Sequence, residues 1–293
     1  MIYDIGLRIR HDYARPAVGG RHVVRVMPLS VAGGQRLVAG TLDITPHPDE
    51  RIDRVDFFGN RVTEFTCRAA HDTVALTVQA QVERLDGAAF SGPSCGLRDL
   101  AAEVARLRDL GAGSPLHFRA PSYRAPLGDA MTAYARGLLH PGMTVAEAVL
   151  AVGGTLHRDM RFDPAATTVD TPAAEAFANR SGVCQDFSHV MICCLRGVGI
   201  PAAYVSGFLR TTPPPGQARL EGADAMHAWV RAWCGPQLGW LEHDPTNNCL
   251  VGQNHVVVAY GRDYSDVAPV KGMVRGSGGQ ASQQAVDMIP LGE

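Results

Sequence analysis

The chain has 293 residues, of which 46% are hydrophobic and 19% are charged, so it can bury the core of one large domain or two small ones. Lys and Arg number 27 against 29 Asp and Glu, which gives a net charge of −2. Because no basic excess is available to neutralise phosphates, we do not expect nucleic acid as a partner. The apolar runs are shorter than the roughly 20 residues of a membrane helix, so we expect no membrane partner either.

Two features of the sequence predict a cytoplasmic protein. The N-terminus, MIYDIGLRIRHDY, carries charges where a signal peptide has its apolar run. Seven cysteines are an odd number in a long chain. That count argues against a disulfide framework and favours a reducing compartment.

Residues 1–92 are predicted to form a β-rich N-terminal domain. The strand-like stretches share alternating or β-branched residues and are separated by Gly, Pro, Asn and Asp. They lie at 21–30, 35–46, 51–67 and 72–85. Residues 57–62 predict a hairpin turn inside the third stretch. Strands of this number are typical of a small sandwich or sheet layer.

The rest of the chain is predicted to mix helices and strands, so the fold class is α+β. Residues 93–127 are expected to form a helical connector with a helix at 94–110, residues 128–270 a catalytic core, and residues 271–293 a C-terminal tail with little order before a short final strand. Helical periodicity in the core appears at 129–139, 144–160, 172–179 and 184–199. Strand patterns appear at 202–209, 227–234, 238–244 and 255–261, and a Pro- and Gly-rich loop lies at 211–224.

Cys184 stands where a nucleophile would be expected. It follows Gly182 and begins the helical run 184–199. The free amides and the dipole at a helix start stabilise a thiolate. A buried structural cysteine is the alternative interpretation of such a residue taken alone.

A thiolate needs a base, and the base needs an orienting group. His227 opens one predicted strand and Asp244 closes the next. If the two strands form a hairpin, the start of the first lies beside the end of the second. The imidazole could then accept the thiol proton through one nitrogen and donate to the carboxylate through the other.

Several ordered motifs resemble the transglutaminase-like superfamily, and more closely its bacterial branch. They are RSGVCQDFSH at 180–189, GIPAAYVSGF at 199–208, AMHAWV at 225–230, GWLEHDPTN at 239–247, HVVVAYGRDYSDVAPV at 255–270 and DFFGN at 56–60. The resemblance implies a papain-like core behind a β-rich N-terminal domain, with Cys184, His227 and Asp244 as the catalytic triad. It further implies a thioester acyl-enzyme on a peptide or protein substrate, resolved by water or by an amine.

Other features of the site are predicted less directly. The backbone N–H of Cys184 is one donor for an oxyanion, and Asn179 and Gln185 are weaker candidates for a second. Trp229 shares a strand face with His227 and could line a substrate pocket. Gln185 follows the nucleophile where animal members of the superfamily have Trp, and no EF-hand calcium loop is present. We therefore expect no metal and no cofactor.

Two hypotheses of other classes remain open. The first is a non-catalytic binding or scaffolding module that keeps the fold without turnover. The second is a metalloprotein that uses Cys234, His243, Cys249 and His255, although their spacing matches no zinc pattern. The remaining candidates are interpreted as structural. They are Cys67, Cys95, Cys193, Cys194, His189, Asp186 and the segment 262–264.

Overall fold

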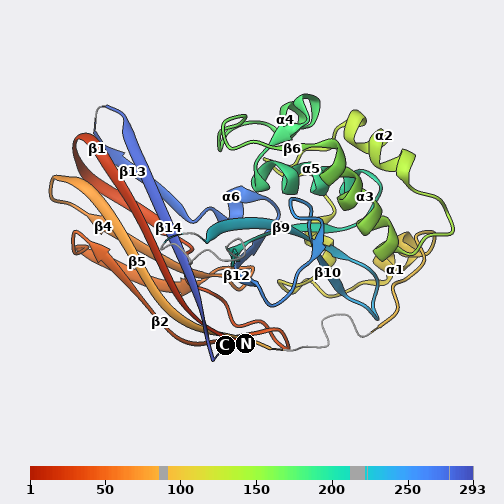
Figure 1. Cartoon of the computed structure of the whole chain (residues 1–293), viewed down its shortest axis with the longest axis horizontal. Helices are drawn as coiled ribbons and strands as arrows, with labels where there is room; N and C mark the ends of the chain where they lie inside the picture. Colours follow the sequence, from red (N-terminus) through yellow and green to blue (C-terminus); the bar gives the residue numbers. More distant parts are fainter. Residues whose placement is uncertain (86–91, 212–221, 223, 277, 293) are drawn as a thin grey trace, which may run out of the picture.

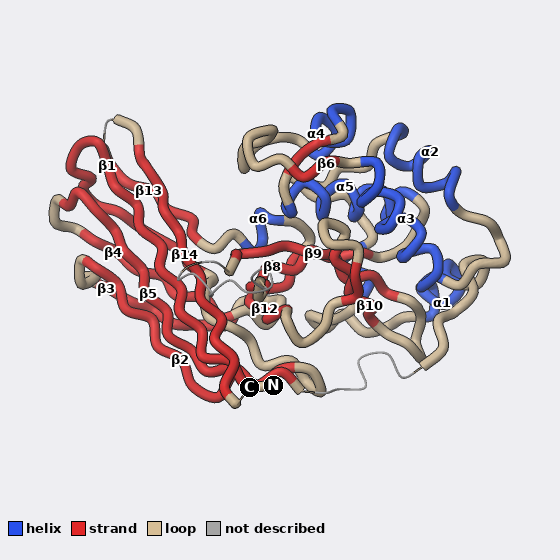
Figure 2. Tube along the Cα trace, in the orientation of Figure 1, coloured by secondary structure: helices blue, strands red, loops and turns tan. Residues whose placement is uncertain are grey.

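The computed structural model describes residues 1–85, 92–211, 222, 224–276 and 278–292. A sheet built largely from the N-terminal part occupies one end of the molecule, and the helices occupy the other, with strands β8, β9 and β12 between them (Figures 1 and 2). The two chain termini lie side by side at the edge of the first sheet (Figure 1). The predicted α+β class is confirmed.

The first sheet has seven strands and is organised around one long strand, β1 (Ile2–Val24). The first half of β1 alternates, which buries Tyr3, Ile5, Leu7 and Ile9 on one face. β5 (His71–Arg84) pairs antiparallel with this half, and β4 (Arg61–Cys67) pairs with the second half. The predicted hairpin turn is present between β3 (Glu50–Val55) and β4, and β2 (Gln35–Thr45) pairs with β5.

The prediction was wrong at both ends of this sheet. The first strand begins at Ile2 and ends at Val24, whereas the pattern predicted a strand at 21–30. The stretch expected to be a tail forms β13 (Val270–Arg275) and β14 (Gln280–Leu291), and both pair with β1. Backbone hydrogen bonds to β1 hold β14 in place over a register from Ile2–Leu291 to Tyr13–Gln280. β13 and β14 are therefore part of the N-terminal sheet.

The core packs helices against one face of a five-stranded sheet of order β11-β10-β9-β8-β12. The strands are β8 (Ala202–Leu209), β9 (Ala225–Trp233), β10 (Trp240–Asp244), β11 (Cys249–Leu250) and β12 (His255–Gly261). The helices are α2 (Asp129–Leu138), α3 (Val145–Asp159), α4 (Ala173–Asn179), α5 (Cys184–Gly197) and α6 (Tyr264–Val267), and β6 (Arg161–Phe162) pairs in parallel with β7 (Ser181–Gly182). The predicted capping box of Thr144 and Glu147 opens α3.

The predicted helical connector is mostly not helical. α1 covers only Leu100–Arg106, and a single 3₁₀ turn covers Pro115–Phe118. Cys95 is held in an extended conformation instead, because its N–H donates to the carbonyl of Cys234 and its carbonyl accepts from Val145. These contacts with distant residues override the local helical pattern. Most of the predicted 211–224 loop lies outside the described residues.

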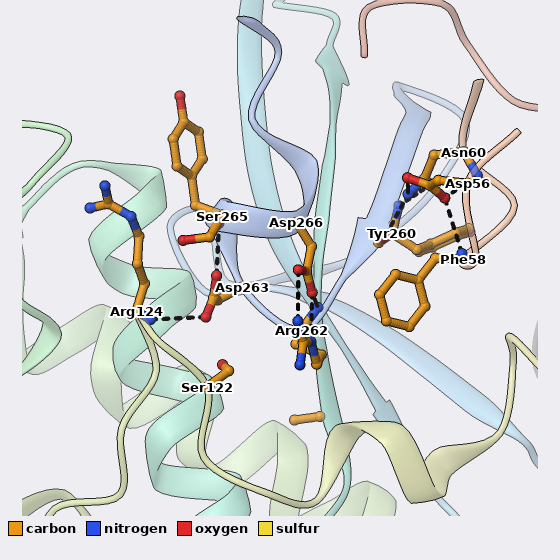
Figure 3. A network of polar contacts seen from close by, with 12 residues as sticks. Asp56, Phe58, Asn60, Ser122, Arg124, Tyr260, Arg262, Asp263, Ser265 and Asp266 are labelled. Atoms are coloured by element: carbon orange, nitrogen blue, oxygen red, sulfur yellow. Dashed lines mark hydrogen bonds and ion pairs between the residues drawn. The ribbon is translucent and has the colours of Figure 1, made fainter. Parts of the chain in front are cut away.

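Two buried amide side chains attach the N-terminal part to β12, the edge strand of the core sheet. Asn60 pairs with the backbone of Tyr260 through two hydrogen bonds of 2.8 Å (Figure 3). Gln35 pairs in the same way with Val257, at 2.9 and 2.8 Å. These contacts satisfy backbone groups that an edge strand would otherwise expose. They also give the turn 56–60 a structural role.

Candidate active site

Cys184 is half-buried at the first position of α5. The turn before it is fixed by Asp186, whose Oδ2 accepts hydrogen bonds from the N–H of Val183 at 2.8 Å and from the Thr167 hydroxyl at 2.6 Å. Burial raises the pKa of Asp186, and the two hydrogen bonds oppose the rise. A Cβ at Gly182 would stand 2.5 Å from the same carboxylate oxygen. Any side chain at position 182 would collide with Asp186, which explains the glycine there. Asp186 in turn caps the N-terminus of α5.

His227 and Asp244 lie together, as the sequence predicted. His227 Nε2 is 2.7 Å from Asp244 Oδ2, and both side chains are buried. Nδ1 is then the ring nitrogen left for the sulfur of Cys184. The structure thus brings all three predicted residues to one place, from α5, β9 and the end of β10.

The imidazole of His227 is stabilised in its charged form. Burial lowers its pKa, but hydrogen bonds with Asp244 and Cys184 and the charges of both groups outweigh this effect and raise the pKa to about 10. An imidazolium next to the sulfur favours a thiolate and carries a proton that a leaving amine can take. This arrangement suits nucleophilic catalysis by sulfur.

Asp244 is wholly buried and fully hydrogen-bonded. Oδ1 accepts from the backbone N–H groups of Thr246 and Asn247 at 2.9 and 3.2 Å. Oδ2 accepts from the Asn247 side chain at 2.7 Å, in addition to the two histidines His227 and His255. Burial raises the pKa of Asp244, but these donors outweigh burial and hold the pKa far below its usual range.

His255 is the residue of the site whose role the sequence interpretation missed. Its Nε2 lies 3.3 Å from Asp244 Oδ2, and the N–H of Gly252 donates to its Nδ1 at 3.4 Å. Since Nδ1 accepts a hydrogen bond, Nε2 carries a proton, and His255 donates to Asp244. Its position at the start of a strand pattern, as for His227, was the only signal in the sequence.

The donor atoms of His227, Asp244 and His255 lie within 4.8 Å of one another, and no other group of three metal-binding side chains is this close in the described parts of the chain. A metal there would displace the hydrogen bonds that now satisfy Asp244. We therefore interpret the group as a hydrogen-bonded cluster. Cys234, His243 and Cys249 do not join it. The proposed four-residue metal cluster of the sequence is thus not assembled.

The other predicted residues take supporting positions. Trp229 has no exposed surface, and its ring packs edge-on against His255 at 5.2 Å. Trp229 therefore packs against the histidine cluster from the inside of the protein. Contact between Trp229 and a substrate stays a prediction. Gln185 donates to the carbonyl of Val169, and Asn179 is exposed at the end of α4. His189 is buried and accepts the N–H of Tyr264.

The segment 262–264 is structural, as expected. Arg262 forms an ion pair with Asp266 at 2.8 Å, and Asp263 accepts the N–H groups of Arg124 and Ser265 (Figure 3). All seven cysteines are unpaired, and Cys193 and Cys194 are core residues of α5. Burial raises the pKa of both thiols. They are therefore poor nucleophiles.

Comparison with known proteins identifies the family. The transglutaminase-like superfamily model matches residues 132–245, and the bacterial transglutaminase-like N-terminal region matches residues 3–83. The chain is 35% identical over 264 residues to an uncharacterised protein of Mycobacterium tuberculosis, covering 88% of this chain and 83% of that one. The chain belongs to the transglutaminase-like superfamily. A relative from Mycobacterium leprae is 28% identical over 97% of this chain and 99% of its own length.

The transglutaminase-like fold is also seen in a solved structure. A Cytophaga hutchinsonii protein described as a candidate cysteine protease superimposes with a TM-score of 0.76 at 22% identity, covering 100% of this chain and 91% of that one. The match spans both the N-terminal sheet and the core. No helix in the described residues is long and apolar enough to cross a membrane.

Proposed function

We propose that this transglutaminase-like protein is a cysteine-dependent enzyme acting on amide bonds of peptides or proteins. Cys184 is the nucleophile, His227 the acid and base, and Asp244 the group that orients the imidazole. One observation carries the proposal: His227 Nε2 lies 2.7 Å from the buried carboxylate of Asp244, and interactions with Asp244 and Cys184 raise the pKa of His227 to about 10. The fold match to a candidate cysteine protease supports it.

The reaction has two halves. The thiolate of Cys184 attacks the acyl carbon, and the C–N bond breaks as His227 gives its Nδ1 proton to the leaving amine. This leaves a thioester on Cys184. Water or a second amine then gives a proton to His227 and attacks the thioester, which restores the thiolate. Asp244 keeps Nε2 protonated throughout and stabilises the imidazolium.

The oxyanion of each tetrahedral intermediate forms next to the start of α5. The first N–H groups of a helix have no partner within the helix, so the N–H of Cys184 can donate to this oxygen. The positive end of the helix adds to the stabilisation. Asp186 supports this role because it fixes the turn from which the N–H projects.

Mass spectrometry of the intact protein with peptide amides tests the proposal. We expect a mass increase equal to the acyl group, mapped to Cys184, that is absent in Cys184→Ala and retained in Cys95→Ala. Cys95 is a matched control because it is also half-buried and lies outside the site. Adding a primary amine distinguishes transfer from hydrolysis by the mass of the product.

An unreactive Cys184 would contradict the proposal. If no amide substrate acylates Cys184 and its half-buried thiol resists iodoacetamide at neutral pH, the protein is a binding module with a transglutaminase-like fold. Metal content measured on the purified protein tests the metalloprotein alternative. A cytoplasmic location stays a prediction, and fractionation of cells that express the protein tests it.

A further inference from the structure

A cavity of about 430 Å³ lies between the N-terminal part and the face of the core sheet that is turned away from α5. The turn 31–34 forms one wall, and residues of β9, β10 and β12 form the other. Apolar and polar surface share the lining about equally, and Trp240 and Tyr260 are its aromatic members. Two guanidinium groups and one carboxylate also line it, from Arg84, Arg231 and Glu242. Small-molecule sites share this size and interdomain position.

Arg231 is held among aromatic rings and has no carboxylate partner. Its guanidinium carbon lies 4.0 Å from the centre of the Tyr260 ring, 4.4 Å from that of Trp240 and 5.4 Å from that of Phe118. Ring contact stabilises the charge but leaves the in-plane N–H donors available. Its Nε is buried without a hydrogen-bond partner. Burial lowers the pKa of Arg231, which shows the cost of keeping this cation out of water.

The charges of the cavity do not balance. Arg84 donates to Gln35 and to the carbonyl of Gly252, and its Nε is also buried and unpartnered. Glu242 is the single carboxylate in the lining, and its oxygens accept from Trp229 at 2.7 Å and from the Tyr260 hydroxyl at 3.2 Å. The charge of Glu242 acts on both arginines and raises the pKa of each, but burial outweighs it. The lining therefore has one more positive than negative charge, and the Nε donors of both arginines are unused.

We propose that this cavity binds a small molecule with an anionic head, a carboxylate or a phosphate, on an apolar body. The head lies against Arg231 and Arg84, where planar guanidinium groups match both kinds of anion. The body packs on Trp240 and the apolar wall. The site is separate from the thiol chemistry and does not depend on it, because the buried Trp229 lies between them: its ring is 6.3 Å from the His227 ring, and its indole N–H donates to Glu242 of the cavity wall.

Direct titration of the full-length protein tests the proposal. The probes are benzoate, phenyl phosphate and uncharged benzyl alcohol, at constant ionic strength, with binding followed by tryptophan fluorescence and calorimetry. We expect saturable binding of at least one anion in the millimolar range or tighter, and binding of benzyl alcohol at least about tenfold weaker. The better of the two anions identifies the head group. Equal binding of charged and uncharged probes, or saturable binding of none, overturns the proposal.

Two variants, one that removes a positive charge from the cavity and one that removes a negative charge, show whether the anion binds there. Arg231→Gln should weaken anion binding about tenfold or more, because a charged donor is lost. Glu242→Gln should strengthen it severalfold, because the opposing charge is removed. Arg36→Gln, at an exposed position on β2 of the N-terminal sheet, should bind as the unmodified protein does. Unchanged affinity in Arg231→Gln rejects the site. If that variant does not fold, unchanged or weaker affinity in Glu242→Gln rejects it.

Discussion

Replacing Asp244 by asparagine should separate the folded scaffold from its reactive thiol. The carboxylate has two groups of donors: two backbone N–H groups on Oδ1, and His227, His255 and the Asn247 side chain on Oδ2. An asparagine must place its NH₂ group at one of these positions. In either orientation the NH₂ group faces N–H donors that the carboxylate used to accept. At least two hydrogen bonds are lost as a result.

The magnitude follows from this count. A hydrogen bond to a charged group contributes about 1.5–3 kcal/mol, so the loss of two costs about 3–6 kcal/mol. Small domains have about 5–15 kcal/mol of stability in total, so we expect a folded but less stable variant. In either orientation His227 loses its charged acceptor, which lowers the pKa of that residue by about one to two units, since one unit corresponds to 1.36 kcal/mol. The imidazolium then stabilises the thiolate of Cys184 less well.

The pH profile of Cys184 alkylation by iodoacetamide measures the effect without a known substrate. We expect the profile to shift to higher pH in Asp244→Asn, by no more than the drop in the pKa of His227, about one to two units. Asp263→Asn is the matched control, because Asp263 is also buried and accepts two backbone N–H groups. It should lose stability while the thiol reacts normally. An unshifted profile in Asp244→Asn, or an equal shift in the control, would refute the reasoning.

Three further predictions concern other parts of the molecule. His255→Phe should shift the pH profile of Cys184 alkylation to lower pH, because Asp244 then accepts from one histidine fewer, stabilises the His227 imidazolium more strongly and so favours the thiolate; an unmoved profile would leave His255 a purely structural role. Asn60→Ala should lower the free energy of unfolding by about 2–5 kcal/mol in urea, since two buried backbone groups lose their partner; a change below about 0.5 kcal/mol, typical of neutral surface positions, would contradict this. Burial lowers the pKa of His22 to about 4, with the nearby His71 and His11 adding to the effect. The folded state therefore binds fewer protons than the unfolded state, and stability is lost as the pH falls from about 6.5 towards 4. His22→Leu should reduce the loss between pH 7 and pH 5 by about 2 kcal/mol, and an unchanged loss in urea titrations at the two pH values would show that His22 is not the group responsible.

The sequence by itself determined the local elements of the core and the position of the site. Helical periodicity after Gly182 placed Cys184 at a helix start, and strand alternation placed His227 and Asp244 on neighbouring strands. These features depend on side-chain patterns within a few residues, which the sequence displays directly. The family motifs then identified the three residues as one set.

Only the tertiary structure decided how distant segments complete these elements. The exposed first half of β14 is mostly polar and carries no strand pattern, and its place beside β1 depends on backbone hydrogen bonds there, while Val286 and Met288 pack into the core further along. The same holds for Asn60 and Gln35, which recognise the backbone of β12 rather than its side chains. His255 acquires its role from a strand edge that these contacts fix, so its bond to Asp244 leaves no mark in the local pattern.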